Sequence, residues 1–343
     1  MLTIEYNKDL SSLNTFSMKV SCACYVEYDS LEDLFKIDFD SLPQPVKHMG
    51  GGSNLLFTSD FKGTILHSGI KFIRLDAEHD DECLIEVGSG VTFDDFIDWA
   101  CSMRLWGTEN LSLIPGEVGA SAVQNIGAYG VEVKDIIVRV NCLDRKIKEL
   151  VTIEKADCHY GYRESFFKNE DKEGRFIITS VLFRLTREYS PRLDYGNLRS
   201  VLQDRTVYAP RDVRDAVIAI RNAKLPDPKQ LGNAGSFFKN PVLTRGQFEA
   251  IEAMNRSENG PDAVLPHYEV ENGIKVPAAW MIERCGFKGL RLGGAAVYEK
   301  QPLVIVNASG EATPEEIIAL ERKIIDGVKA KFGVELHPEV EHL

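Results

Sequence analysis

One segment of this chain, residues 232–241, carries side chains suited to proton transfer. It reads Gly-Asn-Ala-Gly-Ser-Phe-Phe-Lys-Asn-Pro and places the hydroxyl of Ser236 between a glycine and two phenylalanines. A serine that donates a proton needs a dry, positively biased setting, which the two rings and Lys239 would supply. The same pattern is typical of a surface turn followed by a half-buried strand. The segment alone therefore leaves both interpretations open.

Two other segments are rich in glycine and small polar residues. Residues 50–54 read Gly-Gly-Gly-Ser-Asn, and residues 114–130 interleave glycines with Ser121, Gln124 and Asn125. Successive glycines let backbone N–H groups converge on phosphate oxygens. The second segment has few large apolar residues with which to pack, so we expect it to be a loop that wraps around a ligand.

Two common nucleotide-binding motifs are missing from the sequence. It contains neither the G-x-G-x-x-G fingerprint after a first strand nor the G-x-x-x-x-G-K-[ST] phosphate loop. A Rossmann dehydrogenase and a P-loop kinase are both disfavoured. A nucleotide cofactor held in another way stays open.

Composition narrows the protein class. At 343 residues with 44% hydrophobic and 27% charged residues, we expect a globular protein of two or three domains. The net charge of −12 argues against nucleic-acid binding. The seven cysteines show no C-x-x-C pair, which favours reduced thiols and disfavours a metal site. Without a signal peptide or a long apolar run, we expect a cytoplasmic protein with no membrane insertion.

Hydrophobic periodicity and capping signals predict the elements that position these segments. Strands are expected at 82–88, 136–145, 176–185 and 304–306. Helices are expected from Ser30, over 92–103, over 210–224, from Thr244, and from Thr313 to Gly333. The polar stretch 255–275 is expected to be a long loop, a length typical of functional lids.

In order along the chain, these motifs resemble the bacterial UDP-N-acetylenolpyruvoylglucosamine reductases, flavoenzymes of peptidoglycan precursor synthesis. The resemblance covers nearly the full chain. It rests on residues 14–16, 50–57, 114–130, 160–165, 195–198, 232–241, 277–280, 286–289, 293–295, 301–302 and 338–340.

The resemblance implies an α+β fold. An FAD-binding domain of the vanillyl-alcohol-oxidase type is expected over 1–205, with two α/β subdomains at about 1–70 and 71–205. A C-terminal α+β substrate domain is expected over 206–343, with the last residues returning to the active site. FAD would be held without a covalent bond, and NADPH would be the co-substrate. Implied FAD contacts are Gly50, Gly51, Gly52, Ser53, Asn54, Pro115, Gly116, Ser121, Gln124, Asn125 and Gly127.

The resemblance also implies the reaction. The enolpyruvyl group of a UDP-sugar would be reduced to a lactyl ether, giving UDP-N-acetylmuramate. Hydride would pass from NADPH to FAD, and from N5 of the reduced flavin to the alkene. Ser236 would then donate the proton, Arg163 would hold the substrate carboxylate, and Glu339 would stabilise the enolic intermediate as a neutral carboxyl or through water.

Further residues are implied as contacts of the UDP-sugar. Tyr268 would close over the substrate, and Lys239 is a further cation near the motifs. The remaining implied contacts are Tyr195, Lys224, Asn240, Lys275 and Gln301. We expect a monomer.

Other interpretations of the single residues exist. Arg163 could pair with Glu164, Lys224 could complement the dipole of its helix, and Glu339 could be solvated near the C-terminus. For the whole chain, the alternatives are an alcohol oxidase of the same fold, a non-catalytic flavin or nucleotide-sugar binder, and a kinase or ligase. An oxidase gives Ser236 and Glu339 no evident role, a simple binder would not need the proton donor, and a kinase lacks its phosphate loop.

Overall fold

A computed structural model describes residues 1–169, 171, 174–195, 198–202 and 206–343. The chain folds into two units. The first comprises Met1–Leu10, Val20–Gly52 and Asp60–Ala223, and the second comprises Ser11–Lys19, Ser53–Ser59 and Lys224–Leu343. The expected boundary at residue 205 lies outside the described residues, and the observed division falls later, after Ala223.

The later boundary has a packing cause. All but the last residue of helix α6 (Pro210–Lys224) belongs to the first unit. Its apolar face, with Val213 and Val217, is buried against Trp106, and Arg214 forms an ion pair of 2.6 Å with Asp94. The sequence signals a helix here but not the surface on which it packs.

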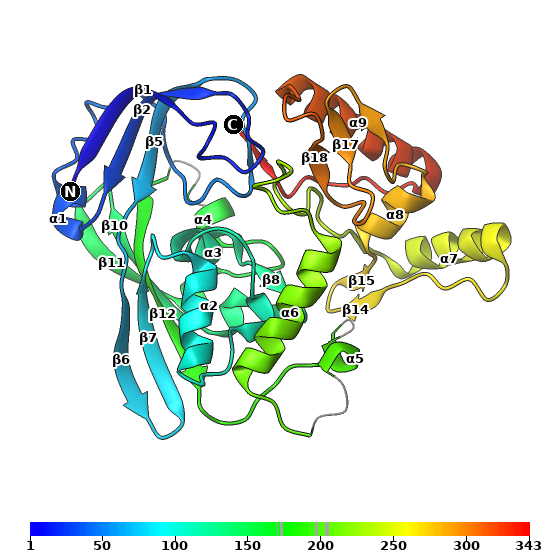
Figure 1. The fold of residues 1–343 in the computed structure, drawn as a ribbon, viewed down its shortest axis with the longest axis horizontal. Coiled ribbons are helices and arrows are strands. Elements are labelled where there is room, and N and C mark those ends of the chain that lie inside the picture. The colour runs from blue at the N-terminus through cyan, green and yellow to red at the C-terminus, as the bar shows by residue number, and fades with distance from the viewer. Residues whose placement is uncertain (170, 172–173, 196–197, 203–205) are drawn as a thin grey trace. The chain divides into compact units, whose positions relative to one another are not determined.

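Two sheets form the framework of the first unit (Figure 1). The first has the order β1-β2-β5-β3, in which β2 and β3 run parallel to β5. The second is antiparallel, with the order β11-β10-β12-β7-β6. The strands of the first sheet are β1 (Thr3–Asp9), β2 (Ser21–Tyr28), β3 (Val46–His48) and β5 (Phe61–Ser68); those of the second are β6 (Ile73–His79), β7 (Glu82–Gly88), β10 (Ile137–Asp144), β11 (Glu149–Glu154) and β12 (Phe176–Thr186).

Helices cover the second sheet and bury its apolar side chains. Helix α2 (Phe93–Ser102) places Phe93, Phe96 and Ile97 in one core with Ile85 and Phe183 of the sheet. The 3.6-residue spacing of these apolar residues predicted this helix, and the structure confirms it. The other described elements of this unit are α1 (Leu31–Phe35), α3 (Val118–Gln124), α4 (Phe166–Asn169), α5 (Leu198–Leu202) and the strands β8 (Gly127–Ala128) and β9 (Val131–Glu132).

The second unit combines short strand groups with three helices. The groups have the orders β13-β15-β14, β16-β17-β18 and β19-β4, and helix α9 (Pro314–Phe332) packs against β17. The capping box of Thr313 and Glu316 starts α9 and Gly333 ends it, as predicted. The remaining elements are β4 (Leu55–Leu56), β13 (Val242–Leu243), β14 (Tyr268–Val270), β15 (Gly273–Lys275), β16 (Arg291–Leu292), β17 (Ala295–Val297), β18 (Ile305–Asn307), β19 (Glu341–His342), α7 (Arg245–Asn259) and α8 (Ala278–Arg284).

The predicted long loop over 255–275 is wrong in part. Helix α7 continues to Asn259, and β14 and β15 form a hairpin in which Tyr268 pairs with Lys275. The polar composition hid this hairpin because only Ile274 of its paired residues is fully buried. Irregular chain is confined to the residues between α7 and β14.

The described residues offer neither a membrane-spanning helix nor a metal site. No helix there is both long and apolar enough to cross a bilayer. The same part of the chain holds no group of three His, Cys, Asp or Glu side chains placed to bind a metal ion.

Candidate functional site

Ser236 and Glu339, far apart in the sequence, lie on adjoining segments of the second unit. Phe238 and Pro338 form an antiparallel bridge. The N–H of Glu339 donates to the carbonyl of Phe237 at 2.8 Å, and the N–H of Lys239 donates to His337 at 2.9 Å. This pairing brings a hydroxyl and a carboxyl into one neighbourhood, as an acid and its supporting group would require.

The two phenylalanines after Ser236 anchor its segment in the core. Phe237 and Phe238 are each 1% exposed, and the Phe237 ring packs edge-on against Phe16 with 6.2 Å between centroids. Ser236 itself is exposed. The expectation that these rings shield the hydroxyl from water is therefore wrong for this state of the protein, because they face the core.

Glycines fix the course of this segment. A Cβ at Gly232 would lie 2.5 Å from the carbonyl oxygen of Phe16, so the backbone can approach this closely only without a side chain. Gly235 has φ of +71°, and its N–H donates to Oδ1 of Asn233 at 2.9 Å. Together these features hold the turn immediately before Ser236.

Asn54, from the first glycine segment, holds the C-terminal segment in place. Its side-chain amide donates to the carbonyl of Glu339 at 3.1 Å, and its own carbonyl accepts from the N–H of Glu341 at 3.0 Å. Strand β19 then pairs in parallel with β4. Asn54 thereby positions the backbone of a predicted catalytic residue, in addition to its predicted role as a cofactor contact.

In the first unit, the two glycine segments lie against each other. A Cβ built at Gly51 would lie 3.4 Å from Cα of Gly116, and one at Gly50 would lie 3.2 Å from Cβ of Ala120. Side chains would fill this space, so the glycines keep bare backbone exposed to a ligand. Such a surface, free of side chains, fits the phosphate-containing part of a dinucleotide cofactor.

The second glycine segment is not the unpacked loop that we expected. Residues Val118–Gln124 form helix α3, which packs against β7 and β12. Its small residues allow this close approach: a Cβ at Gly119 would lie only 3.0 Å from Cβ of Ser89. The hydroxyl of Ser121 is buried and donates to the carbonyl of Val118 at 2.7 Å. A lack of large apolar residues indicated tight packing here rather than a loop.

Arg163 binds the last part of the second glycine segment. Its guanidinium donates to the carbonyls of Asn125 at 3.2 Å and Gly127 at 2.7 Å. Its backbone has φ of +58°, a left-handed conformation that is rare for residues other than glycine and clusters at functional sites. The amide of Asn125 donates in turn to the carbonyl of Gly161 at 2.7 Å. These bonds place a permanent positive charge beside the second glycine segment.

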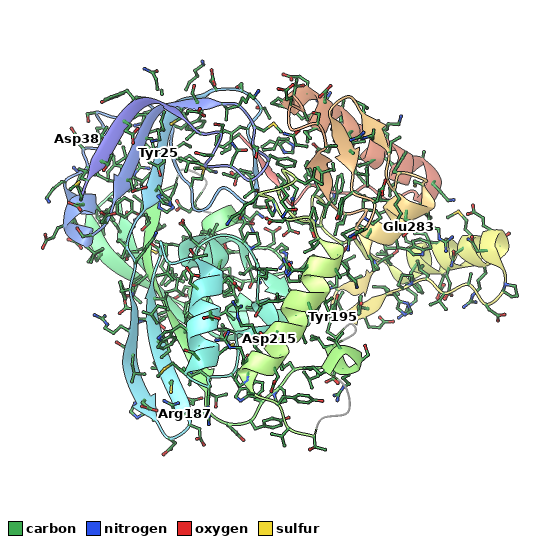
Figure 2. The ribbon with its side chains drawn as sticks, in the orientation of Figure 1. Tyr25, Asp38, Arg187, Tyr195, Asp215 and Glu283 are labelled. Atoms are coloured by element: carbon green, nitrogen blue, oxygen red, sulfur yellow. The ribbon has the colours of Figure 1, made fainter. Side chains whose placement is uncertain are left out.

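The remaining predicted contacts in the first unit are partly engaged in the fold. Oε1 of Gln124 accepts from the ammonium of Lys168 at 2.9 Å. Tyr195 (Figure 2) is 37% exposed. It packs next to Gly130, where an added Cβ would lie 3.3 Å from the Cβ of Tyr195. Residues 196 and 197 of its motif lie outside the described residues. Pro115 is exposed beside Gly116.

The remaining predicted substrate contacts belong to the second unit. Oδ1 of Asn240 accepts from the N–H of Ala278 at 2.9 Å and so caps α8. Oε1 of Gln301 accepts weakly from the N–H of Leu303 at 3.4 Å. In the hairpin, the ammonium of Lys275 lies 6.0 Å from the centre of the Tyr268 ring. Lys224 is exposed at the end of α6. Ser53, a predicted FAD contact, also belongs to the second unit and is half-buried.

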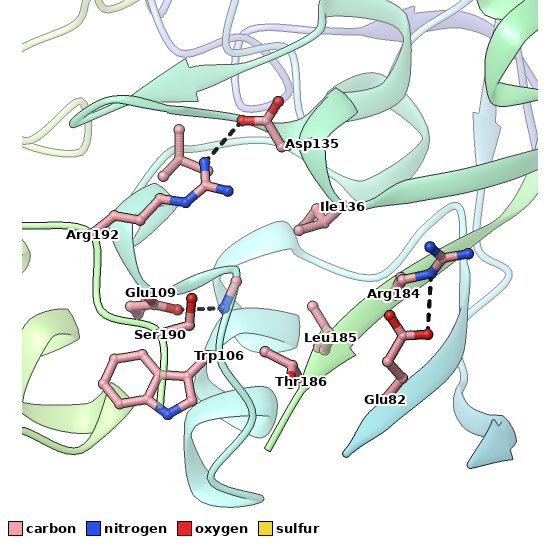
Figure 3. A pocket seen from close by; sticks show the side chains of 12 residues that line it. Glu82, Trp106, Glu109, Asp135, Ile136, Arg184, Leu185, Thr186, Ser190 and Arg192 are labelled. Atoms are coloured by element: carbon pink, nitrogen blue, oxygen red, sulfur yellow. Dashed lines mark hydrogen bonds and ion pairs between the residues drawn. The ribbon is translucent and has the colours of Figure 1, made fainter. Parts of the chain in front are cut away.

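A pocket of about 190 Å³ in the first unit contains none of the predicted site residues (Figure 3). Its two arginines are already paired: Arg192 lies 3.4 Å from Asp135, and Arg184 lies 3.9 Å from Glu82 (Figure 3). Paired charges leave little net field to attract an ionic ligand. We assign no function to this pocket.

The sequence analysis missed a charged cluster next to the glycine segments. His67 contacts Glu117 with one ring nitrogen and Glu27 with the other, each at 2.9 Å. Glu117 lies inside the second glycine segment, where a carboxylate among small residues was a visible signal. His67 gave none, because it lies in a strand of otherwise ordinary composition, β5.

Known proteins resemble the chain along almost its whole length. A UDP-N-acetylenolpyruvoylglucosamine reductase from Bacteroides fragilis (strain YCH46) is 49% identical over 98% of this chain and 99% of its own. The protein of the same name from Chromobacterium violaceum is 46% identical, over 98% of this chain and 99% of its own. The chain belongs to the UDP-N-acetylenolpyruvoylglucosamine reductase family. The recognition made from the ordered motifs is thereby confirmed.

Two family models match separate parts of the chain. The model for the C-terminal domain of UDP-N-acetylenolpyruvoylglucosamine reductase matches residues 227–343, which include Ser236 and Glu339. The model for an FAD binding domain matches residues 38–150, which include both glycine segments. Family membership and the FAD-domain match identify an oxidoreductase of the flavoprotein class.

Solved structures confirm the predicted fold. The UDP-N-acetylenolpyruvylglucosamine reductase of Thermus caldophilus aligns over 100% of this chain and 98% of its own, with a TM-score of 0.68 at 19% identity. A solvent-stable cholesterol oxidase aligns over 98% of this chain and 87% of its own, with a TM-score of 0.50 at 11% identity. The α+β fold with an FAD-binding domain of the vanillyl-alcohol-oxidase type is therefore correct.

Proposed function

We propose that this protein reduces the enolpyruvyl group of UDP-N-acetylglucosamine enolpyruvate to give UDP-N-acetylmuramate, with FAD as cofactor and NADPH as co-substrate. The names of its relatives support the substrate. The observation that carries the proposal is the pairing of the Ser236 segment with the Glu339 segment, since reducing an enol ether requires a proton donor. An alcohol oxidase of the same fold would have no use for this pair.

The cofactor would be held by the two glycine segments. Gly50 and Gly51 present bare backbone next to Gly116, a surface that suits the phosphates of FAD. When bound, FAD supplies the hydride that the alkene receives at its β-carbon. The hydrogen bonds of Arg163 and Asn125 hold the second segment in shape around that surface.

Ser236 would donate the proton that completes the reduction. Its hydroxyl is exposed in the described structure, so the substrate itself must exclude water from it. The buried rings of Phe237 and Phe238 keep the segment from shifting while the proton moves. Glu339, fixed through its backbone by Asn54 and Phe237, would stabilise the enolic form of the substrate carboxylate.

The anionic parts of the substrate would be bound by cations and amides. Arg163 would hold the enolpyruvyl carboxylate, because a guanidinium offers two parallel donors and keeps its charge. Lys224, Lys275 and the exposed face of Tyr195 would contact the diphosphate. Asn240 and Gln301 would donate through their side-chain NH₂ groups, since their oxygens already accept backbone N–H groups. Tyr268, exposed on its hairpin, would cover the sugar.

The domain roles follow from these assignments. We propose that residues 1–205 form the main part of the FAD-binding domain and that residues 206–343 supply most substrate contacts. The exceptions are α6, which folds with the first unit except for Lys224, and the segments Ser11–Lys19 and Ser53–Ser59, which fold with the second. We further propose that the enzyme is a cytoplasmic monomer.

A two-step experiment under anaerobic conditions tests the function. NADPH should bleach the yellow holoprotein, and the enolpyruvyl sugar nucleotide should then restore the flavin absorbance with formation of the lactyl ether. Reduction of the flavin by an alcohol, and its reoxidation when oxygen is admitted, without a response to the sugar nucleotide, would identify an alcohol oxidase instead. Failure of NADPH to bleach the flavin would point to a non-catalytic binding protein.

The role of Arg163 gives a first prediction. Arg163→Lys keeps the charge but loses the paired donors, so we expect KM for the enolpyruvyl substrate to rise about tenfold, as for loss of a charged hydrogen bond of about 1.5 kcal/mol. Bleaching by NADPH should remain. Steady-state kinetics with matched FAD content measure this. Arg187→Lys, on an exposed ion pair with Glu78, is the control. An unchanged KM would contradict the role.

A further inference from the structure

A histidine bridges two carboxylates beside the proposed FAD surface. Nδ1 of His67 lies 2.9 Å from Oε2 of Glu27, and Nε2 lies 2.9 Å from Oε1 of Glu117. An ionised carboxylate only accepts hydrogen bonds, so two such carboxylates at these distances require a proton on each ring nitrogen. The geometry therefore describes an imidazolium between two carboxylates.

Through Glu117, the bridge contacts both glycine segments. Glu117 follows Gly116 and precedes α3, but its side chain does not cap that helix. Its Oε1 is held by His67, while a Cβ at Gly50 would lie 3.2 Å from its Oε2. The Glu117 side chain is only 13% exposed, and that of His67 only 17%. A carboxylate at this position would repel a phosphate group unless its charge were neutralised.

Other titratable groups surround the bridge. The ring of Tyr25, which is labelled in Figure 2, stacks on His67 with 6.2 Å between centroids. The Tyr25 hydroxyl donates to Glu27 at 3.0 Å. The carboxylate of Asp29, the residue that follows β2, interacts electrostatically with the carboxylate of Glu27. Burial and the charge of His67 lower the pKa of His48 to about 4, so His48 is neutral. Tyr28, whose hydroxyl contacts His48 at 3.1 Å, also stays neutral because burial raises its pKa.

The protonation of His67 sets the net charge of the cluster. Burial lowers the pKa of His67, but its hydrogen bonds and charge interactions with Glu117 and Glu27 outweigh burial, so that the pKa is raised above 6.5. Below that pKa, one positive charge offsets one of the two carboxylates. When the pH rises above this pKa, His67 loses its positive charge and the proton of one of its two hydrogen bonds. The negative charge of the Glu117 carboxylate beside Gly50 is then no longer offset.

We propose that His67 is a positioning residue that holds Glu117 away from the cofactor phosphates and makes FAD affinity depend on pH. The inference rests on the proposed FAD site at the glycine segments. FAD should bind most tightly while His67 is protonated. Affinity should fall about tenfold as His67 loses its proton, the size expected for one added like charge several ångströms away at a partly screened site.

Release of FAD from the full-length holoprotein tests this directly. Flavin fluorescence after dilution, measured from pH 5.5 to 9, should show a Kd for FAD that rises about tenfold with one titration. His67→Gln should remove that titration, and Glu117→Gln should keep the affinity high at every pH, because it removes the carboxylate. His79→Gln, an exposed histidine at the end of β6, should behave as the unchanged protein does.

The outcomes separate this inference from the proposed function. A Kd that is flat with pH, or a titration that persists in both His67→Gln and Glu117→Gln, overturns the role of His67 even if the enzyme reduces its substrate. A purified protein that binds no FAD overturns the proposed function itself. Should His67→Gln fail to fold, as judged by its thermal melting, Glu117→Gln alone decides.

Discussion

Replacing Ser236 by alanine is expected to lower turnover of the enolpyruvyl sugar nucleotide by about 10²- to 10⁴-fold, the usual contribution of a positioned general acid. The segment is anchored by Phe237, Phe238 and the bridge to Pro338 rather than by the Ser236 hydroxyl. Folding and FAD content should therefore be unchanged. Stopped-flow absorbance should show that NADPH still bleaches the flavin.

The two half-reactions make this prediction specific. Only reoxidation by the enolpyruvyl substrate requires the proton of Ser236, so only that half should slow. Ser257→Ala, on the exposed surface of α7 in the same unit, is the matched control and should keep both rates. Equal slowing of both half-reactions in Ser236→Ala would indicate a structural role. An unchanged rate of reoxidation by the enolpyruvyl substrate would contradict the proposal that Ser236 donates the proton.

Local signals predicted the regular elements well. The periodic apolar residues of α2 and the capping boxes of α7 and α9 act within a few residues, and the structure confirms these helices. Strands β7 and β12, predicted at 82–88 and 176–185, were likewise identified correctly. These elements form the frame on which the site stands.

Features that depend on distant contacts were not predictable in the same way. The segments Ser11–Lys19 and Ser53–Ser59 join the second unit through bonds such as that from Asn54 to Glu339, which no local pattern encodes. Helix α3 was mistaken for a loop because its small residues pack through close backbone approach rather than through large side chains. The Ser236 segment suggested proton transfer by its own residues, whereas Glu339 was predicted as a site residue only through the family resemblance. The pairing of their two segments became visible only in the structure.

The left-handed backbone of Arg163 shows the same limit. Its φ of +58° serves two hydrogen bonds to carbonyls of the second glycine segment, about forty residues earlier in the chain. The sequence indicated an arginine of the right type for a carboxylate. It gave no sign that this arginine also shapes the neighbouring segment.

The second large effect is expected from Gly50→Val. An added Cβ would already lie 3.2 Å from both Ala120 and Glu117, so the larger branched side chain must push the two glycine segments apart. Overpacking of this kind costs about 1–3 kcal/mol. If that cost falls on the bound state, FAD affinity should drop by about fivefold to a hundredfold, because 1.4 kcal/mol corresponds to tenfold. The ratio of flavin to protein absorbance after purification, together with the Kd for FAD, measures the effect.

Gly246→Val is the matched control for this change, because a Cβ at Gly246 meets nothing within 4 Å. It should retain FAD as the unchanged protein does. Thermal melting separates the two origins of any loss: a Gly50→Val protein that melts normally without FAD, yet binds FAD weakly, locates the cost at the cofactor surface. Gly50→Ala, a smaller intrusion, should lie between the two. Full FAD retention in Gly50→Val would mean that the glycine segments do not hold the cofactor, since no phosphate could reach backbone that a valine side chain covers.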